Sequence, residues 1–202
     1  MNAVSKRMTC LLWLGFHANI CVICTIICGS LFIQFVLKEF PCPLCMTQRI
    51  SMVLCGLAQA YIICRIRIDR RLHWQDFAFG QGMTLCAAIA GACMSIRHIL
   101  LHIIPPDLGY GSPIFGMHIY TWALLVFAAE IVVVAVNLLL APKNMSEVEL
   151  PFAWLSRTIL VLFAVVILAF AIGTFVEQGF HWRLPDNPER NELLYDLGFK
   201  RC

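Results

Sequence analysis

The sequence predicts an all-α membrane protein, a bundle of five transmembrane helices, from its composition and from the length of its apolar runs. Of the 202 residues, 60% are hydrophobic and only 13% are charged, whereas about 25% are charged in an average soluble domain. The mean hydropathy is +0.80. Because a helix needs about 20 apolar residues to cross the hydrocarbon core, the chain has room for four or five spans and for no sizeable soluble domain.

Each of the five apolar runs is close to the length that a transmembrane helix requires. The first run follows Lys6 and Arg7, but it is longer than the hydrophobic part of a secretory signal, which has about 7 to 15 residues. We therefore interpret it as a retained helix. In order along the chain, the runs cover residues 10–37, 50–66, 77–104, 117–140 and 152–176.

The distribution of basic residues predicts the orientation in the membrane. The connection between the second and third runs holds Arg65, Arg67, Arg70 and Arg71, whereas residues 103–117 contain no Lys or Arg. Because basic loops favour the cytoplasmic side, the N-terminus and the arginine-rich connection are predicted to be cytoplasmic. The loops before the second and fourth runs then lie on the opposite side, together with the C-terminal tail. Cytoplasmic arginines at the lipid surface are enough to explain the net charge of +3, so no nucleic-acid partner is expected.

The loop at residues 38–50, KEFPCPLCMTQRI, contains a Cys-x-x-C pair. A residue before proline avoids the helical region and proline suits the first helical position, so Cys42 is predicted to cap a helix that begins at Pro43. Cys45 then lies in the first turn, where free backbone N–H groups stabilise a thiolate. Arg49, four residues on, shares its helix face and is suited to hold a thiolate, a quinone oxygen or a lipid phosphate. We interpret Cys42 and Cys45 as a redox pair on the side where disulfides persist.

The remaining cysteines and the histidines are weaker candidates. His98 and His102 are spaced i, i+4, so they are suited to line a pocket, to bind a metal or to lie at the membrane interface. A zinc site at the cysteine pair would need two more ligands, and the facing loop offers only His118. A haem held by His98 with His17 or His118 is not expected. Cysteines within the apolar runs are interpreted as packing residues: Cys10, Cys21, Cys24, Cys28, Cys55, Cys64, Cys86 and Cys93.

Polar residues near the later runs add two expectations. Glu130 lies midway along the fourth run, where an ionisable side chain is either functional or paired with another polar group. Tyr120 opens the same run and is suited to the interface or to stacking on a quinone. Near the chain end, Leu193, Leu194 and Leu197 have the spacing of a short amphipathic surface helix.

Two motifs give the chain a resemblance to a known family. PCPLCMTQR, at residues 41–49, resembles the start of the second helix in the DsbB family, the quinone-dependent thiol oxidases of bacterial inner membranes. RHILLHIIPPD, at residues 97–107, resembles the end of that family's third helix. The resemblance implies a DsbB-like four-helix core at residues 1–140. A cytoplasmic loop and an added fifth transmembrane helix would follow at 141–176, and a periplasmic tail at 177–202.

The resemblance also implies roles for individual residues. Cys42 would be the more exposed cysteine, which exchanges with a dithiol partner, and Cys45 would face the quinone. Arg49 would polarise the quinone, with His98 near its ring and His102 in the same pocket. Electrons would pass from a periplasmic DsbA-like thioredoxin-fold oxidase, or from another dithiol protein, to ubiquinone or menaquinone, and disulfide formation would be supported.

One departure from the family leaves several alternatives open. The best-known members carry a second cysteine pair in the loop that corresponds to residues 103–117, and this loop contains no cysteine. The Cys42–Cys45 pair then takes electrons directly from a partner, or Cys202 acts as a tethered shuttle, or oxidase activity has been lost and the quinone pocket kept. In the last case the protein is a noncatalytic or assembly subunit of a larger inner-membrane complex.

Overall fold

The computed structural model describes residues 3–106, 109–141, 153–181, 188 and 190–198, and in this part of the chain the fold is all-α. Five of its helices are long and apolar enough to cross a membrane, which confirms the predicted fold class. A sixth, of five residues, follows near the C-terminus. The helices are α1 (Ala3–Phe35), α2 (Pro43–Asp69), α3 (Trp74–Leu101), α4 (Ile119–Leu140), α5 (Ala153–Gln178) and α6 (Glu192–Asp196).

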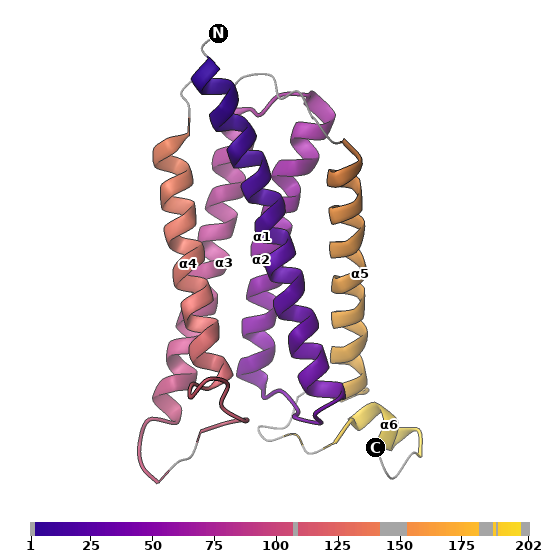
Figure 1. The fold of residues 1–202 in the computed structure, drawn as a ribbon. Coiled ribbons are helices and arrows are strands. Elements are labelled where there is room, and N and C mark those ends of the chain that lie inside the picture. Colours follow the sequence, from indigo (N-terminus) through magenta and orange to yellow (C-terminus); the bar gives the residue numbers. More distant parts are fainter. Residues whose placement is uncertain (1–2, 107–108, 142–152, 182–187, 189, 199–202) are drawn as a thin grey trace.

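Helix α2 occupies the centre of the bundle and contacts each of the other four long helices (Figure 1). Small residues let the helices approach closely, as is usual in membrane bundles. A Cβ atom added to Gly91 of α3 would lie 2.2 Å from Cζ of Phe127 on α4, so only glycine leaves room for that ring. The buried core lies between the helices, while many Leu, Val, Ile and Phe side chains face outward, as lipid contact requires.

The two connections that matter for function lie at one end of the bundle, which we call the Cys42 end. The α1–α2 connection, the α3–α4 connection and α6 are all found there, opposite the N-terminus (Figure 1). The first two are joined by hydrogen bonds: the Tyr110 hydroxyl donates to the Phe40 carbonyl over 2.7 Å, and the Ser112 N–H donates to the Glu39 carboxylate over 3.2 Å. These loops therefore form one layer across the helix ends.

Helix α5 is fixed to α1 by a buried polar contact near each of its ends. His17 Nε2 lies 3.0 Å from the Ser156 hydroxyl, and Gln34 Nε2 donates to Glu177 Oε2 over 3.0 Å. Close approach is possible at Gly173, where an added Cβ would lie 3.1 Å from a Leu31 methyl group. The added fifth helix is thus an integral part of the bundle.

The end of α5 corrects one prediction. The sequence places Glu177 in the tail, but α5 continues through Gln178 and Glu177 is fully buried within it. A buried carboxylate is tolerated where a hydrogen-bond donor meets it, and Gln34 supplies that donor. The surface helix predicted near the chain end is the short α6, and Cys202 lies outside the described residues.

Candidate functional site

The start of α2 holds the cysteine pair as the sequence predicts. Cys42 is the N-cap, with extended backbone angles of φ −72° and ψ 166°, and Pro43 is the first helical residue. The backbone N–H of Cys45 donates to Cys42 Sγ over 3.4 Å, and the two sulfur atoms are 3.2 Å apart. The geometry of a capped helix start therefore holds both sulfurs together at the Cys42 end.

Hydrogen bonds at this helix start favour a thiolate on Cys42. Hydrogen bonding with the Cys45 sulfur, and to a smaller extent with His98, lowers the pKa of the Cys42 thiol to about 4, although burial opposes the shift. The sequence places the stabilised thiolate on Cys45, whereas these hydrogen bonds favour it on Cys42. The physical reason is that the free N–H groups of a first turn point back towards the capping residue.

His98 of α3 lies against both sulfur atoms. Its Nε2 is 3.8 Å from Cys42 Sγ and its Nδ1 is 4.0 Å from Cys45 Sγ. The ring is buried, with its centroid 4.3 Å from that of the Tyr120 ring. Cys42, Cys45 and His98 offer three ligand atoms within 4.8 Å of one another. Among the described residues this cluster is one ligand short of a closed structural zinc site.

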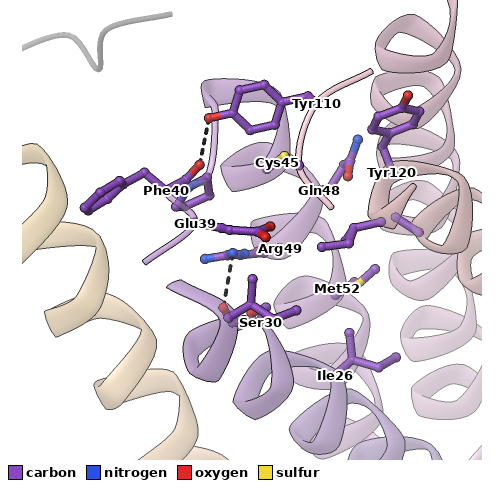
Figure 2. Close-up of a pocket in the computed structure, with 15 residues that line it drawn as sticks. Ile26, Ser30, Glu39, Phe40, Cys45, Gln48, Arg49, Met52, Tyr110 and Tyr120 are labelled. Atoms are coloured by element: carbon purple, nitrogen blue, oxygen red, sulfur yellow. Dashed lines mark hydrogen bonds between the residues drawn. The ribbon is translucent and has the colours of Figure 1, made fainter. Parts of the chain in front are cut away.

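A cavity of about 620 Å³, which we call the Arg49 cavity, lies beside Cys45 between α1, α2 and the start of α4 (Figure 2). Arg49 is fixed at its wall, because Nη1 donates to Gln34 Oε1 over 2.7 Å and Nη2 donates to the Ser30 carbonyl over 3.4 Å. Most of the remaining lining is apolar or aromatic, and it includes Ile26, Ile33, Phe40, Met52, Tyr110, Ile119 and Tyr120.

An apolar groove continues from the Arg49 cavity along α1 and α4 at the Cys42 end of the bundle. The two spaces share Ile26, Ser30, Ile33 and Ile119, and the groove has a volume of about 700 Å³. We call it the α1–α4 groove. Its further lining consists of Gly29, Ile114, Phe115 and Trp122, so it offers a lipid-like chain an apolar path to the cavity.

Cys42 lines a different and wider cavity of about 1480 Å³, which we call the His98 cavity. Its lining includes Arg97 and His98 of α3, the α3 C-cap residue His102, and Tyr110. Of the three residues predicted to contact a quinone, only Arg49 therefore shares a cavity with Cys45. Their roles stay predictions.

Two finer predictions about these residues are wrong. Cys42 is the more buried cysteine, with 6% of its surface exposed, because His98 lies against its sulfur. Helix α3 ends at Leu101, with His102 as its C-cap, and does not continue to residue 104. The following Pro105 and Pro106 explain this end, since a residue before proline avoids the helical region and proline has no N–H to donate.

The other polar candidates within the bundle pair with protein groups. Glu130 accepts a hydrogen bond from Asn19 Nδ2 over 2.9 Å. His17 Nδ1 lies 2.7 Å from the Trp13 carbonyl, and His118 Nδ1 lies 3.1 Å from the Gly111 carbonyl.

Sequence reasoning missed Gln34 and Glu177, which meet although they are 143 positions apart. Their only sequence signal is that each is a polar residue near the end of an apolar run that finishes at the same membrane face.

Comparison with known proteins adds an independent observation. The family model described as disulfide bond formation protein DsbB matches residues 11–111, which is half of the chain. Disulfide bond formation protein B 1 of Pseudomonas fluorescens is 31% identical over 156 residues, which cover 60% of this chain and 89% of that protein. Disulfide bond formation protein B of Burkholderia ambifaria is 25% identical over 166 residues, which cover 67% and 91%. No solved structure gives a significant match.

The five long apolar helices indicate a multi-pass membrane protein, and these matches place it among the disulfide bond formation proteins. The chain belongs to the DsbB family. The matched segment contains Cys42, Cys45, Arg49 and His98, whereas α4, α5 and α6 lie beyond it.

Proposed function

We propose that this protein oxidises a dithiol protein through the Cys42–Cys45 pair and passes the electrons to a membrane quinone, ubiquinone or menaquinone. One observation carries the proposal: the pair stands between two cavities, with Cys42 lining one and Cys45 lining the other beside Arg49. The His98 cavity is then the side of the electron donor, and the Arg49 cavity is the side of the acceptor.

On the donor side, the chemistry is thiol–disulfide exchange. A thiolate of the partner attacks Cys42 of the oxidised pair, a mixed disulfide forms and the Cys45 sulfur is released. The second thiol of the partner then displaces Cys42, so the partner leaves as a disulfide and the pair becomes a dithiol. A low pKa makes a sulfur a better leaving group, and the hydrogen bonds of Cys42 to Cys45 and His98 support that role.

On the acceptor side, the Arg49 cavity fits a quinone ring by the chemistry of its lining. Small-molecule sites are mostly apolar with a few placed polar groups, and the cavity combines apolar and aromatic side chains with the Arg49 guanidinium. The α1–α4 groove is suited to an isoprenoid tail. A bound quinone would take up two electrons and two protons and leave as the quinol, while Cys42 and Cys45 return to the disulfide.

Arg49 supplies a permanent positive charge beside that acceptor. A guanidinium stays protonated at any working pH, and Gln34 and the Ser30 carbonyl hold it at the cavity wall. A fixed cation stabilises negative charge that develops on an oxygen next to it. The role of Arg49 is therefore electrostatic, and Cys45 lies close enough to share it.

We place the protein in the bacterial inner membrane, with the Cys42 end in the periplasm and a DsbA-like thioredoxin-fold protein as partner. The arginine-rich connection at the opposite end supports this orientation. There Arg65 pairs with Asp69 over 3.0 Å and with Asp76 over 3.1 Å. Since residues 103–117 contain no cysteine, we propose that the partner exchanges directly with Cys42.

The test is to follow quinone absorbance after a reduced thioredoxin-like protein is added to the purified protein with ubiquinone. The wild type should reduce quinone, and Cys42→Ser and Cys45→Ser should each lower the rate by about a thousandfold or more, because one sulfur cannot form the pair. Equal rates in wild type and variants, or no reduction with any dithiol protein tested, would contradict the proposal.

A second candidate is a noncatalytic subunit of a larger membrane complex. The loop without the second cysteine pair and the added helix α5 favour it. In that case the purified protein would not reduce quinone, and it would co-purify from mild detergent with stoichiometric partner subunits.

A further inference from the structure

Two glutamates are buried on membrane-spanning helices, and their surroundings are alike in one respect. Glu130 of α4 and Glu177 of α5 each accept a hydrogen bond from an amide of α1, Asn19 Nδ2 over 2.9 Å and Gln34 Nε2 over 3.0 Å. Their exposed fractions are 7% and 0%. The difference is that the amide that binds Glu177 also binds Arg49.

Gln34 bridges Glu177 and Arg49 with the two ends of one amide. Its Nε2 donates to Glu177 Oε2, while its Oε1 accepts from Arg49 Nη1 over 2.7 Å. An amide has one donor end and one acceptor end, so the carboxylate, which accepts, and the guanidinium, which donates, fix the same orientation of Gln34. Because Gln34 is 2% exposed, water does not compete for either bond.

Contact with α1 does not by itself explain why a carboxylate stands at position 177. Its Oε1 is buried and makes no hydrogen bond within the described part of the chain. Burying such an oxygen is costly unless an opposite charge lies near, and Arg49 is the cation at the other end of the Gln34 bridge. Gly173, one turn earlier, brings α5 close enough to α1 for this contact.

We propose that Glu177 is a positioning residue for Arg49, so that α5 takes part in the quinone site without lining it. Glu177 orients Gln34, and Gln34 holds the guanidinium at the wall of the Arg49 cavity. This inference rests on the proposed function, and it assigns a role to a residue beyond the segment 11–111 that the family model matches. Without the carboxylate, the Gln34 amide can rotate and the short bond to Arg49 is lost.

The first test measures binding of a short-chain ubiquinone to the purified protein without any dithiol. Glu177→Ala should weaken quinone affinity about tenfold, the effect of a lost hydrogen bond to a charged group. Glu177→Gln should stay within about threefold of wild type, because its amide oxygen still accepts from Gln34. Glu130→Ala, the matched control, should also stay within that range. An unchanged affinity in Glu177→Ala, or an equal loss in Glu130→Ala, overturns the proposal.

A double-mutant comparison separates positioning from general packing. In an Arg49→Ala background, Glu177→Ala should cause no further loss of quinone affinity, because the residue acts through Arg49. Two losses that simply add would overturn the proposal. Gln34→Leu removes the same bridge from the α1 side and leaves α5 intact. It should therefore reproduce the tenfold loss of quinone affinity even where Glu177→Ala fails to fold. An unchanged affinity in Gln34→Leu would again overturn the proposal.

A readout without quinone distinguishes this proposal from the proposed function. Phenylglyoxal modifies arginine side chains, and mass spectrometry can follow its reaction with Arg49 in the detergent-purified protein. Modification should be several-fold faster in Glu177→Ala than in wild type or Glu130→Ala, because the guanidinium is released. If the wild type binds no quinone but this difference is seen, the proposed function fails and the positioning role stands. If the modification rate does not change, the positioning role fails.

Discussion

The Arg49 cavity and the His98 cavity lie on either side of one cysteine pair, yet their physical properties differ. The first is smaller, about 620 Å³, and combines mostly apolar walls with a guanidinium that donates to Gln34 and to the Ser30 carbonyl. The second is about 1480 Å³, and its lining includes Arg97 and two histidines. A pair placed between two such sites can exchange electrons with a protein on one side and with a hydrophobic acceptor on the other. The proposed donor and acceptor then never need to meet.

The largest effect that would sharpen this comparison is expected from Arg49→Ala. Loss of hydrogen bonds to a charged group costs about 1.5 to 3 kcal/mol each, so quinone affinity should fall about 10- to 100-fold. Formation of a mixed disulfide with a single-cysteine thioredoxin-like partner should change by less than about threefold. Quinone titration and gel-shift kinetics measure the two quantities. A similar loss in both would mean that the cavities are not functionally separate.

His98→Ala should have the opposite pattern and a smaller effect. Because His98 helps to lower the pKa of Cys42, its removal should raise that pKa, so less thiolate is present at acidic pH. In the reduced wild type, alkylation of Cys42 by iodoacetamide should stay nearly constant from about pH 8 to pH 6 and decrease as the pH falls towards the pKa. In His98→Ala the decrease should begin at higher pH, with a several-fold slower rate near pH 5.

The control for this measurement is quinone affinity, which should be unchanged within about threefold in His98→Ala, since His98 lines the other cavity. Identical pH profiles of Cys42 alkylation in wild type and variant would show that the imidazole has no influence on the thiolate.

The smallest expected effect concerns the α1–α4 groove. A Cβ atom at Gly29 meets nothing within 4 Å, so Gly29→Leu should be accommodated in α1 and should partly fill the groove. Affinity for a long-tail ubiquinone should fall about three- to tenfold, as loss of contact with a few methylene groups predicts. Affinity for a short-tail ubiquinone should not change. Competition binding with both quinones checks this, and equal losses would exclude the groove as the tail site.

Much of the fold and part of the site follow from local sequence. Run length and composition predict five transmembrane helices, and the proline on each side of Cys42 predicts the start of α2 at Pro43. Arg49 follows from spacing along the same helix. These predictions succeed because helix formation and capping depend on residues within a few positions of one another.

The parts that could not be predicted depend on contacts between distant segments. His98 of α3 lies against the cysteine sulfurs, and Gln34 of α1 donates a hydrogen bond to Glu177 of α5. Apolar runs reveal which residues are in the membrane but not how the helices are rotated against one another. The apolar run ends at residue 176, so the sequence places Glu177 in the tail, whereas its hydrogen bond with Gln34 lets α5 include it.

The most direct test of the account identifies which cysteine accepts the partner. The oxidised wild-type protein is mixed with a reduced thioredoxin-like protein that keeps only its attacking cysteine, so the mixed disulfide accumulates. Peptide mass spectrometry then locates the cross-link. The account predicts a bond to Cys42, with the Cys45 thiol free to alkylate beside Arg49. A cross-link at Cys45 would contradict the assignment of the donor to the His98 cavity and of the acceptor to the Arg49 cavity.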